Sequence, residues 1–169
     1  PILVDDAHAQ QQRQQLLALS ETALIEANEL GMVQCLQQAK RPFIAGPYLN
    51  IYNGPCLDWY QKLGAQCWCS PVELSHEALA ALLNEATAEI ETEVFVHGQL
   101  PLAISTRCFT ARHHHIPKQN CEQVCANYPD GLALRTQADE AFLSLNGVQV
   151  LSASIQCLMG QILELAALN

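Results

Sequence analysis

Three cysteines, Cys108, Cys121 and Cys125, are the side chains whose type and spacing best suit chemistry. They lie in residues 108–131, a stretch with prolines and polar residues instead of a periodic apolar pattern. Such a backbone can bend enough to bring three thiolates around one centre, as iron–sulfur ligation requires. A four-iron cluster takes four protein ligands, and no further cysteine stands at a CxxC distance from these three. The fourth ligand would then lie outside this sequence.

The same segment is open to two other interpretations. Three cysteines with one of His113, His114 or His115 would complete a tetrahedral Cys3His zinc site. Alternatively, the thiols stay reduced and unliganded, and the adjacent histidines are solvated in a polar loop. The spacing alone does not choose among iron–sulfur, zinc and free thiols.

The same segment is the most basic stretch of an acidic chain. Arg107 and Arg112 flank Cys108, and Lys118 follows a few residues later. Guanidinium groups bind anionic ligands well, so an anionic substrate or the negative charge of a cluster would fit here. A solvated polar loop is the alternative.

The other five cysteines have a simpler interpretation. Eight cysteines would suggest disulfides in a secreted domain, but the sequence shows no signal peptide, which favours metal binding or free thiols. Cys behaves as a small hydrophobic residue inside helices and strands. Cys67 and Cys69 face the same side of an expected strand, and we expect no ligand role for them. The remaining three are Cys35, Cys56 and Cys157.

Charge and hydropathy exclude several classes of protein. The formal net charge of the 169 residues is -9, and no long basic tract could neutralise phosphates, so nucleic acid is not an expected partner. No stretch approaches the roughly 20 apolar residues of a membrane-spanning helix, and we expect a cytoplasmic protein. The sequence begins inside an apolar run, which predicts a piece of a longer protein. It contains no GxSxG, HExxH or P-loop motif.

Apolar periodicity predicts the elements that would position these residues. Short apolar runs alternate with longer segments of helical spacing, the pattern of parallel βαβ units. Ser75 suits the N-cap of the fourth helix. The expected strands are residues 2–5, 23–26, 42–45, 66–69 and 93–97, and the expected helices are 10–19, 31–39, 54–63 and 75–88.

This alternation predicts an α/β fold of the TIM-like (β/α) barrel type, present as an incomplete fragment. Polar residues follow several strands directly, where parallel α/β folds bind their ligands. These residues are Asp5, Glu26, Asn50 and Glu73. We expect one domain over residues 1–169, in which residues 1–99 form the βα units.

A different pattern begins at Leu100. Residues 100–131 are expected to form a long cysteine-containing loop. Residues 132–169 are expected to hold a hairpin and a C-terminal helix at 155–168. The hairpin strands, 142–145 and 148–151, flank Asn146-Gly147, a strong two-residue turn signal.

Residues 93–108 resemble the signature of the collagenase-like peptidase family U32, with Glu93, Phe95, Gly98, Ser105 and Cys108 in step. The family pattern has another cysteine where this sequence has a proline, at position 101. That departure, and the pair of cysteines at 121 and 125, resemble the UbiV-like branch of the family. The motifs at residues 50–53 and 71–75 agree with that branch.

The resemblance implies a 4Fe-4S cluster, for which Cys108, Cys121 and Cys125 match three of four ligands and the fourth precedes the sequence. It also implies oxygen-independent hydroxylation of a ubiquinone precursor, together with a UbiU-like sister subunit and a lipid-binding accessory protein. Arg107, Arg112 and Glu73 would line the approach to the cluster. The alternatives are a U32 peptidase and a non-catalytic, zinc-stabilised interaction module.

Overall fold

The structure, a computed structural model, describes residue 2 and residues 6–168. The chain forms two compact units. Unit 1 comprises Pro1–Phe95 with Gln161–Asn169, and unit 2 comprises Val96–Gly160. The fold is mixed α/β, with a parallel sheet in unit 1 and an antiparallel sheet in unit 2.

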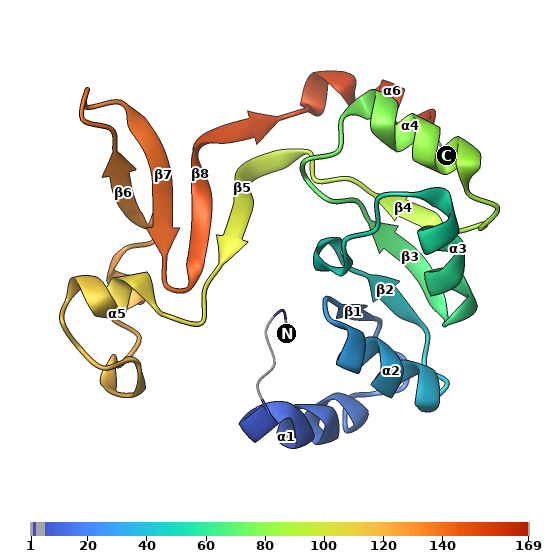
Figure 1. The fold of residues 1–169 in the computed structure, drawn as a ribbon, viewed down its shortest axis with the longest axis horizontal. Coiled ribbons are helices and arrows are strands. Elements are labelled where there is room, and N and C mark those ends of the chain that lie inside the picture. Colours follow the sequence, from blue (N-terminus) through green and yellow to red (C-terminus); the bar gives the residue numbers. More distant parts are fainter. Residues whose placement is uncertain (1, 3–5, 169) are drawn as a thin grey trace. The chain divides into compact units, whose positions relative to one another are not determined.

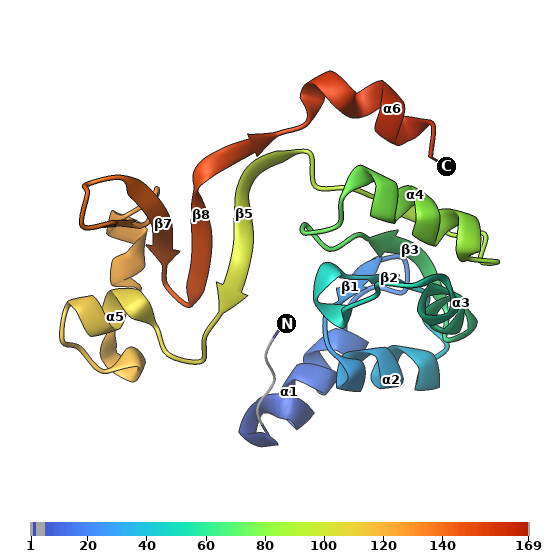
Figure 2. The ribbon, with the colours of Figure 1, turned by 45° about the horizontal axis from the view of Figure 1, so that its top comes forward.

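Unit 1 is built on four parallel strands in the order β1-β2-β3-β4. Helices α2 to α4 alternate with these strands and lie on one face of the sheet (Figures 1 and 2). The strands are β1 (Ile25–Ala27), β2 (Phe43–Ala45), β3 (Ala65–Cys69) and β4 (Glu91–Glu93). The α-helices are α1 (Asp6–Leu17), α2 (Leu30–Gln38), α3 (Gly54–Lys62), α4 (His76–Glu85) and α6 (Ile162–Ala166), and the 3-10 turn is η1 (Pro47–Leu49). A further 3-10 turn, η4 (Met159–Gln161), spans the boundary between the two units.

Side chains at the helix starts fix where three of these helices begin. The carboxylate of Glu29 accepts from the backbone N–H groups of Gly31 and Met32 at the start of α2. The side-chain oxygen of Asn53 accepts from the backbone N–H of Cys56 at the start of α3. The Ser75 hydroxyl accepts from Ala78 N–H in α4, which confirms the predicted cap. Each bond satisfies a donor that has no partner within its helix.

The helix-covered face of the sheet carries the apolar core. Phe43, Trp68 and Leu36 are fully buried there, and residues of α1 to α4 complete the cluster. Every buried residue of this cluster belongs to unit 1. Alternate strand residues face the helices, so the intervening residues face the opposite side of the sheet.

Unit 2 is an antiparallel sheet in the order β5-β8-β7-β6. Among its described residues only Thr110, Ala111 and Ser144 are buried. Its strands are β5 (His97–Ile104), β6 (Leu132–Arg135), β7 (Ala141–Asn146) and β8 (Gln149–Cys157), and its short helices are α5 (Phe109–His113), η2 (Lys118–Asn120) and η3 (Val124–Asn127).

The predicted hairpin is confirmed, and several neighbouring predictions are wrong. Asn146-Gly147 joins β7 to β8, and Gly147 has φ +60°. The strand expected at 93–97 is absent, because β4 ends at Glu93 and β5 begins at His97. Residues 100–104 belong to β5 and not to a loop, and residues 155–157 belong to β8 and not to a helix.

These errors share one physical cause. In β5 and β8, His97 pairs with Cys157 and Gln99 pairs with Ile155, across more than fifty residues of sequence. Backbone hydrogen bonds between such distant segments leave no periodic signal in either one. The first expected strand, 2–5, lies outside the described residues except for Ile2, and α1 starts before the predicted position.

Within the described residues, no helix combines the length and the apolar character needed to cross a membrane.

Candidate functional site

The three predicted cysteine ligands all lie in unit 2, and all three are half-buried. Cys108 is the N-cap of α5, and its sulfur accepts from Ala111 N–H at 3.4 Å. Cys121 follows η2 directly, and Cys125 lies inside η3. All eight cysteines are free thiols.

The backbone between Cys121 and Cys125 is strained. Glu122 and Gln123 both adopt left-handed conformations, with φ of 46° and 56°. Backbone hydrogen bonds close the turn on each side, from Val124 N–H to the Cys121 carbonyl and from Tyr128 N–H to the Cys125 carbonyl. Consecutive left-handed residues other than glycine need support from their surroundings.

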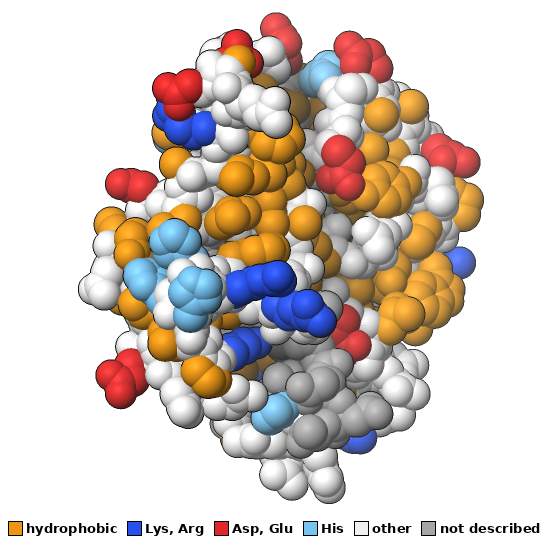
Figure 3. Space-filling model, turned by 60° about the vertical axis from the view of Figure 1, so that its left-hand side comes forward, with side chains coloured by type: hydrophobic (Ala, Val, Ile, Leu, Met, Phe, Trp, Pro, Cys, Tyr) orange, Lys and Arg blue, Asp and Glu red, His pale blue; other side chains and the backbone are white. Residues whose placement is uncertain are grey.

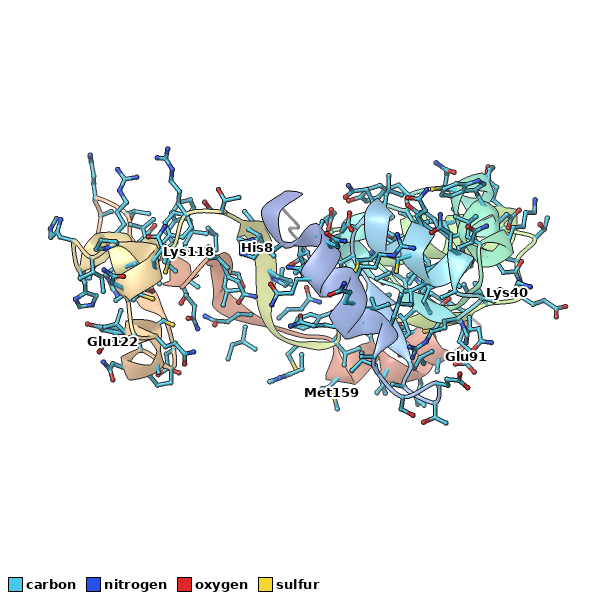
Figure 4. All side chains as sticks on the ribbon, turned by 90° about the horizontal axis from the view of Figure 1, so that it is seen from below. His8, Lys40, Glu91, Lys118, Glu122 and Met159 are labelled. Carbon is cyan, nitrogen blue, oxygen red and sulfur yellow. The ribbon has the colours of Figure 1, made fainter. Side chains whose placement is uncertain are left out.

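Polar contacts tie this turn to the region of Cys108. The ammonium group of Lys118 donates to the Thr106 carbonyl at 3.1 Å. The Tyr128 hydroxyl and Nε2 of His114 share a hydrogen bond of 2.9 Å. Figure 4 labels Lys118 within this segment, and Figure 3 shows histidine side chains gathered beside Lys and Arg side chains.

The structure brings the predicted residues into one unit but not into one metal centre. Arg107 and Arg112 are exposed on either side of Cys108. In the part of the chain that the structure describes, no three or more His, Cys, Asp or Glu side chains are grouped so that they could hold a metal ion. The donor set still supplies three thiols of the kind that a cluster or zinc takes.

Glu73, the third predicted substrate residue, belongs to unit 1, at the carboxyl edge of the parallel sheet. The Tyr52 hydroxyl donates to its carboxylate, and this bond raises the pKa of Tyr52 to about 12. Tyr48 lies nearby, and its pKa is raised by burial and by the negative charges of Glu26 and Glu73. Glu26 lies inside β1 and Glu73 follows β3, and both carboxylates act on Tyr48 near the carboxyl ends of these parallel strands.

The face of the sheet opposite the helices carries a second set of polar residues. Cys67 and Cys69 both face this side, next to Glu91 and Glu93 of β4. The Cys69 thiol donates to the Glu93 carboxylate at 3.1 Å. Burial and then the hydrogen bond to Glu93 raise the pKa of Cys69, while burial and the Glu93 charge raise that of Cys67 to about 11. Both thiols are therefore protonated and unreactive at neutral pH.

The sequence analysis did not predict the contact of Cys69 with Glu93, although the sequence contains a signal for it. Cys69 ends one parallel strand, and Glu93 ends the next strand along the chain. Residues in those positions become neighbours once both strands join one sheet. His114 and Tyr128 gave no comparable signal, because their contact depends on how two short helices pack.

The comparisons with known proteins identify the family. The model of peptidase family U32 matches residues 2–169. The chain belongs to this family. A collagenase of Porphyromonas gingivalis is 26% identical over 133 residues, which cover 72% of this chain and 30% of that protein. The chain thus spans less than a third of the length of that relative. No solved structure matches this chain.

Family membership confirms the signature recognised at residues 93–108. In this U32 chain the signature begins with Glu93 at the end of β4, runs through β5 and ends with Cys108 at the start of α5. Its first residue, Glu93, accepts a hydrogen bond from the Cys69 thiol, and its last residue, Cys108, caps α5. The signature thus contributes residues to both units.

Proposed function

We propose that this U32 chain is part of an iron–sulfur protein of the UbiV-like branch, which takes part in oxygen-independent hydroxylation during ubiquinone biosynthesis. The observation that carries the proposal is the position of its three predicted ligands. Cys108, Cys121 and Cys125 lie in one small unit, outside any apolar core, on turns connected by polar contacts. Structural cysteines are usually buried among apolar side chains instead.

Cys108, Cys121 and Cys125 would supply three of the four thiolates of a 4Fe-4S cluster, and a cysteine outside this chain would supply the fourth. When bound, such a cluster provides one-electron chemistry. Arg107 and Arg112 are exposed cations that would bind an anionic substrate group. Glu73 would contribute an acceptor at the sheet edge, with its carboxylate already oriented by Tyr52.

The proposal extends to fold and partners. Four parallel strands in sequential order, with helices on one face, are what a segment of a (β/α) barrel contains. The partners would be a UbiU-like sister subunit, a lipid-binding accessory protein and a ubiquinone precursor, in the cytoplasm. Nucleic acid is not among them, because the net charge is -9.

Metal analysis of the anaerobically purified full-length protein tests the proposal. Iron and sulfide in comparable amounts, with a broad visible absorption band, are expected. Cys121→Ser should remove the band, whereas Cys157→Ser, which changes an exposed thiol of the same unit, should keep it. Zinc in place of iron would support the zinc-stabilised interaction module, and an absence of both metals would refute both proposals.

A peptidase is the second candidate, because the curated relative is named a collagenase. Incubating the full-length protein with collagen or casein, with and without oxygen, separates the two functions. Cleavage that persists in Cys121→Ser would favour the peptidase. No cleavage together with bound iron would favour the hydroxylation protein.

A further inference from the structure

The structure distinguishes His114 from the two histidines beside it. His113 and His115 are exposed, whereas His114 is half-buried. Its Nε2 shares the 2.9 Å hydrogen bond with the Tyr128 hydroxyl, and the two rings lie 5.5 Å apart at a tilt of 37°. The His113 ring also packs edge-on against the His114 ring, with centroids 5.0 Å apart, but the hydrogen bond to Tyr128 belongs to His114.

This hydrogen bond joins two of the elements that carry cysteines, α5 and η3. His114 is the C-cap of α5, and Cys108 is the N-cap of the same short helix. Tyr128 is the C-cap of η3, which contains Cys125. The bond therefore sets the position of one cysteine-bearing element relative to the other.

The turn between them is closed by its own backbone hydrogen bonds, but no core anchors it. None of the side chains at residues 121–128 is fully buried. It nevertheless contains the left-handed pair Glu122 and Gln123, a conformation that its surroundings must maintain. The contact of Lys118 with the Thr106 carbonyl supports η2, at the opposite end of the segment.

We propose that His114 is a positioning residue, whose hydrogen bond to Tyr128 holds the turn of Cys121 and Cys125 against α5 before any metal binds. A turn that is already ordered loses less conformational entropy when its thiols take up a ligand. His114 acts through Tyr128 and is not itself a ligand. The benefit for metal binding rests on the proposed iron–sulfur function, whereas the ordering of the turn does not.

Hydrogen exchange in the metal-free, reduced full-length protein tests the ordering directly. The amides of Val124, Ala126 and Tyr128 donate to carbonyls within the turn and report on its opening. Because one hydrogen bond of this kind changes an opening equilibrium by about two- to tenfold, their exchange should accelerate by that factor in His114→Ala and in Tyr128→Phe. His113→Ala, the matched control, removes the edge-on contact with the His114 ring but keeps the hydrogen bond to Tyr128, so it should exchange close to the wild type and clearly more slowly than His114→Ala.

A double variant gives a second reading. His114→Ala with Tyr128→Phe should exchange no faster than the more affected single variant, because both changes remove the same bond. Equal exchange in His113→Ala and His114→Ala would overturn the proposal, as would fully additive effects in the double variant. If Tyr128→Phe fails to fold by circular dichroism, the comparison of His114→Ala with His113→Ala decides alone.

Iron loading separates this proposal from the proposed function. After anaerobic reconstitution with iron and sulfide, the visible band should bleach a few-fold faster in His114→Ala than in His113→Ala when a chelator is added. If the wild type takes up no iron, the proposed function fails, and hydrogen exchange still judges the positioning role. If all variants bind iron with equal kinetics and exchange alike, the positioning role fails and the proposed function stands.

Discussion

Different interactions stabilise the interior of each of the two units of this U32 chain. Unit 1 packs a cluster of buried apolar side chains between its parallel sheet and its helices. Unit 2 buries three side chains among its described residues, and its order rests on strand pairing and polar contacts. The three cysteines of interest lie in the unit without an apolar core. A segment of this kind can adjust around a ligand, whereas a close-packed core resists displacement.

The largest difference in stability should be between substitutions of a buried and an exposed phenylalanine. Phe43 is fully buried in unit 1, and Phe142 of unit 2 is 57% exposed. Phe43→Ala should lower the free energy of unfolding by about 3–5 kcal/mol, because it leaves a cavity in a packed core. Phe142→Ala should change it by at most about 0.5 kcal/mol. Urea unfolding followed by circular dichroism measures both, and similar losses would mean that unit 2 has a core of its own.

Two glycines in unit 2 test how far its turns depend on backbone geometry. A Cβ at Gly131, where φ is +77°, would lie 2.3 Å from the Ser144 hydroxyl. A Cβ at Gly147, where φ is +60°, would meet nothing within 4 Å. Gly147→Ala should therefore cost only the left-handed conformation, about 1 kcal/mol, and Gly131→Ala should cost more, about 2–3 kcal/mol. Exchange of amides in β6 and β7 measures the difference, and equal costs would contradict it.

Thiol reactivity provides a smaller and more local contrast. At pH 8, Cys67 and Cys69 should be alkylated slowly, because burial and Glu93 raise their pKa values. Glu93→Gln removes the negative charge, so the pKa values of both thiols should fall. Because a fall of one pKa unit multiplies the thiolate fraction by about ten, alkylation should become several-fold faster. Glu91→Gln is the matched control on the same face and should have a weaker effect. Mass spectrometry of the labelled peptides reports the rates.

The smallest effect concerns the exposed pair of Tyr52 and Glu73. Glu73→Gln should bring the pKa of Tyr52 down from about 12 toward its ordinary value of 10, as measured by the ultraviolet absorption of the phenolate. The folded pKa is the higher one, so the pair stabilises the fold below pH 10 and this contribution is lost as the pH rises through 12. At pH 7 the variant should lower the unfolding midpoint only slightly, because the pair is exposed to solvent. An unaltered phenolate titration would show that Glu73 does not hold Tyr52.

Sequence patterns predicted unit 1 better than unit 2 for a physical reason. The helices of unit 1 follow local rules, such as the spacing of Leu79 and Leu82 and the cap at Ser75, and the structure confirms them. Strand β5 depends on pairing with the distant β8, so local pattern predicts a loop for its residues 100–104. The cysteines stood out by type and spacing, but the bond between His114 and Tyr128 depends on tertiary packing that no local pattern encodes.

Both tryptophans of the chain belong to unit 1, and they differ in their surroundings. Trp68 is fully buried and Trp59 is 49% exposed. Tryptophan fluorescence, excited at wavelengths where tyrosine does not absorb, therefore arises from unit 1 alone, with a blue-shifted emitter shielded from iodide and a second emitter open to quenching. A fluorescence experiment would follow the melting of the parallel sheet while giving no direct signal from the cysteine-bearing unit. A tryptophan placed at the exposed Phe142 would give unit 2 an optical reporter of its own.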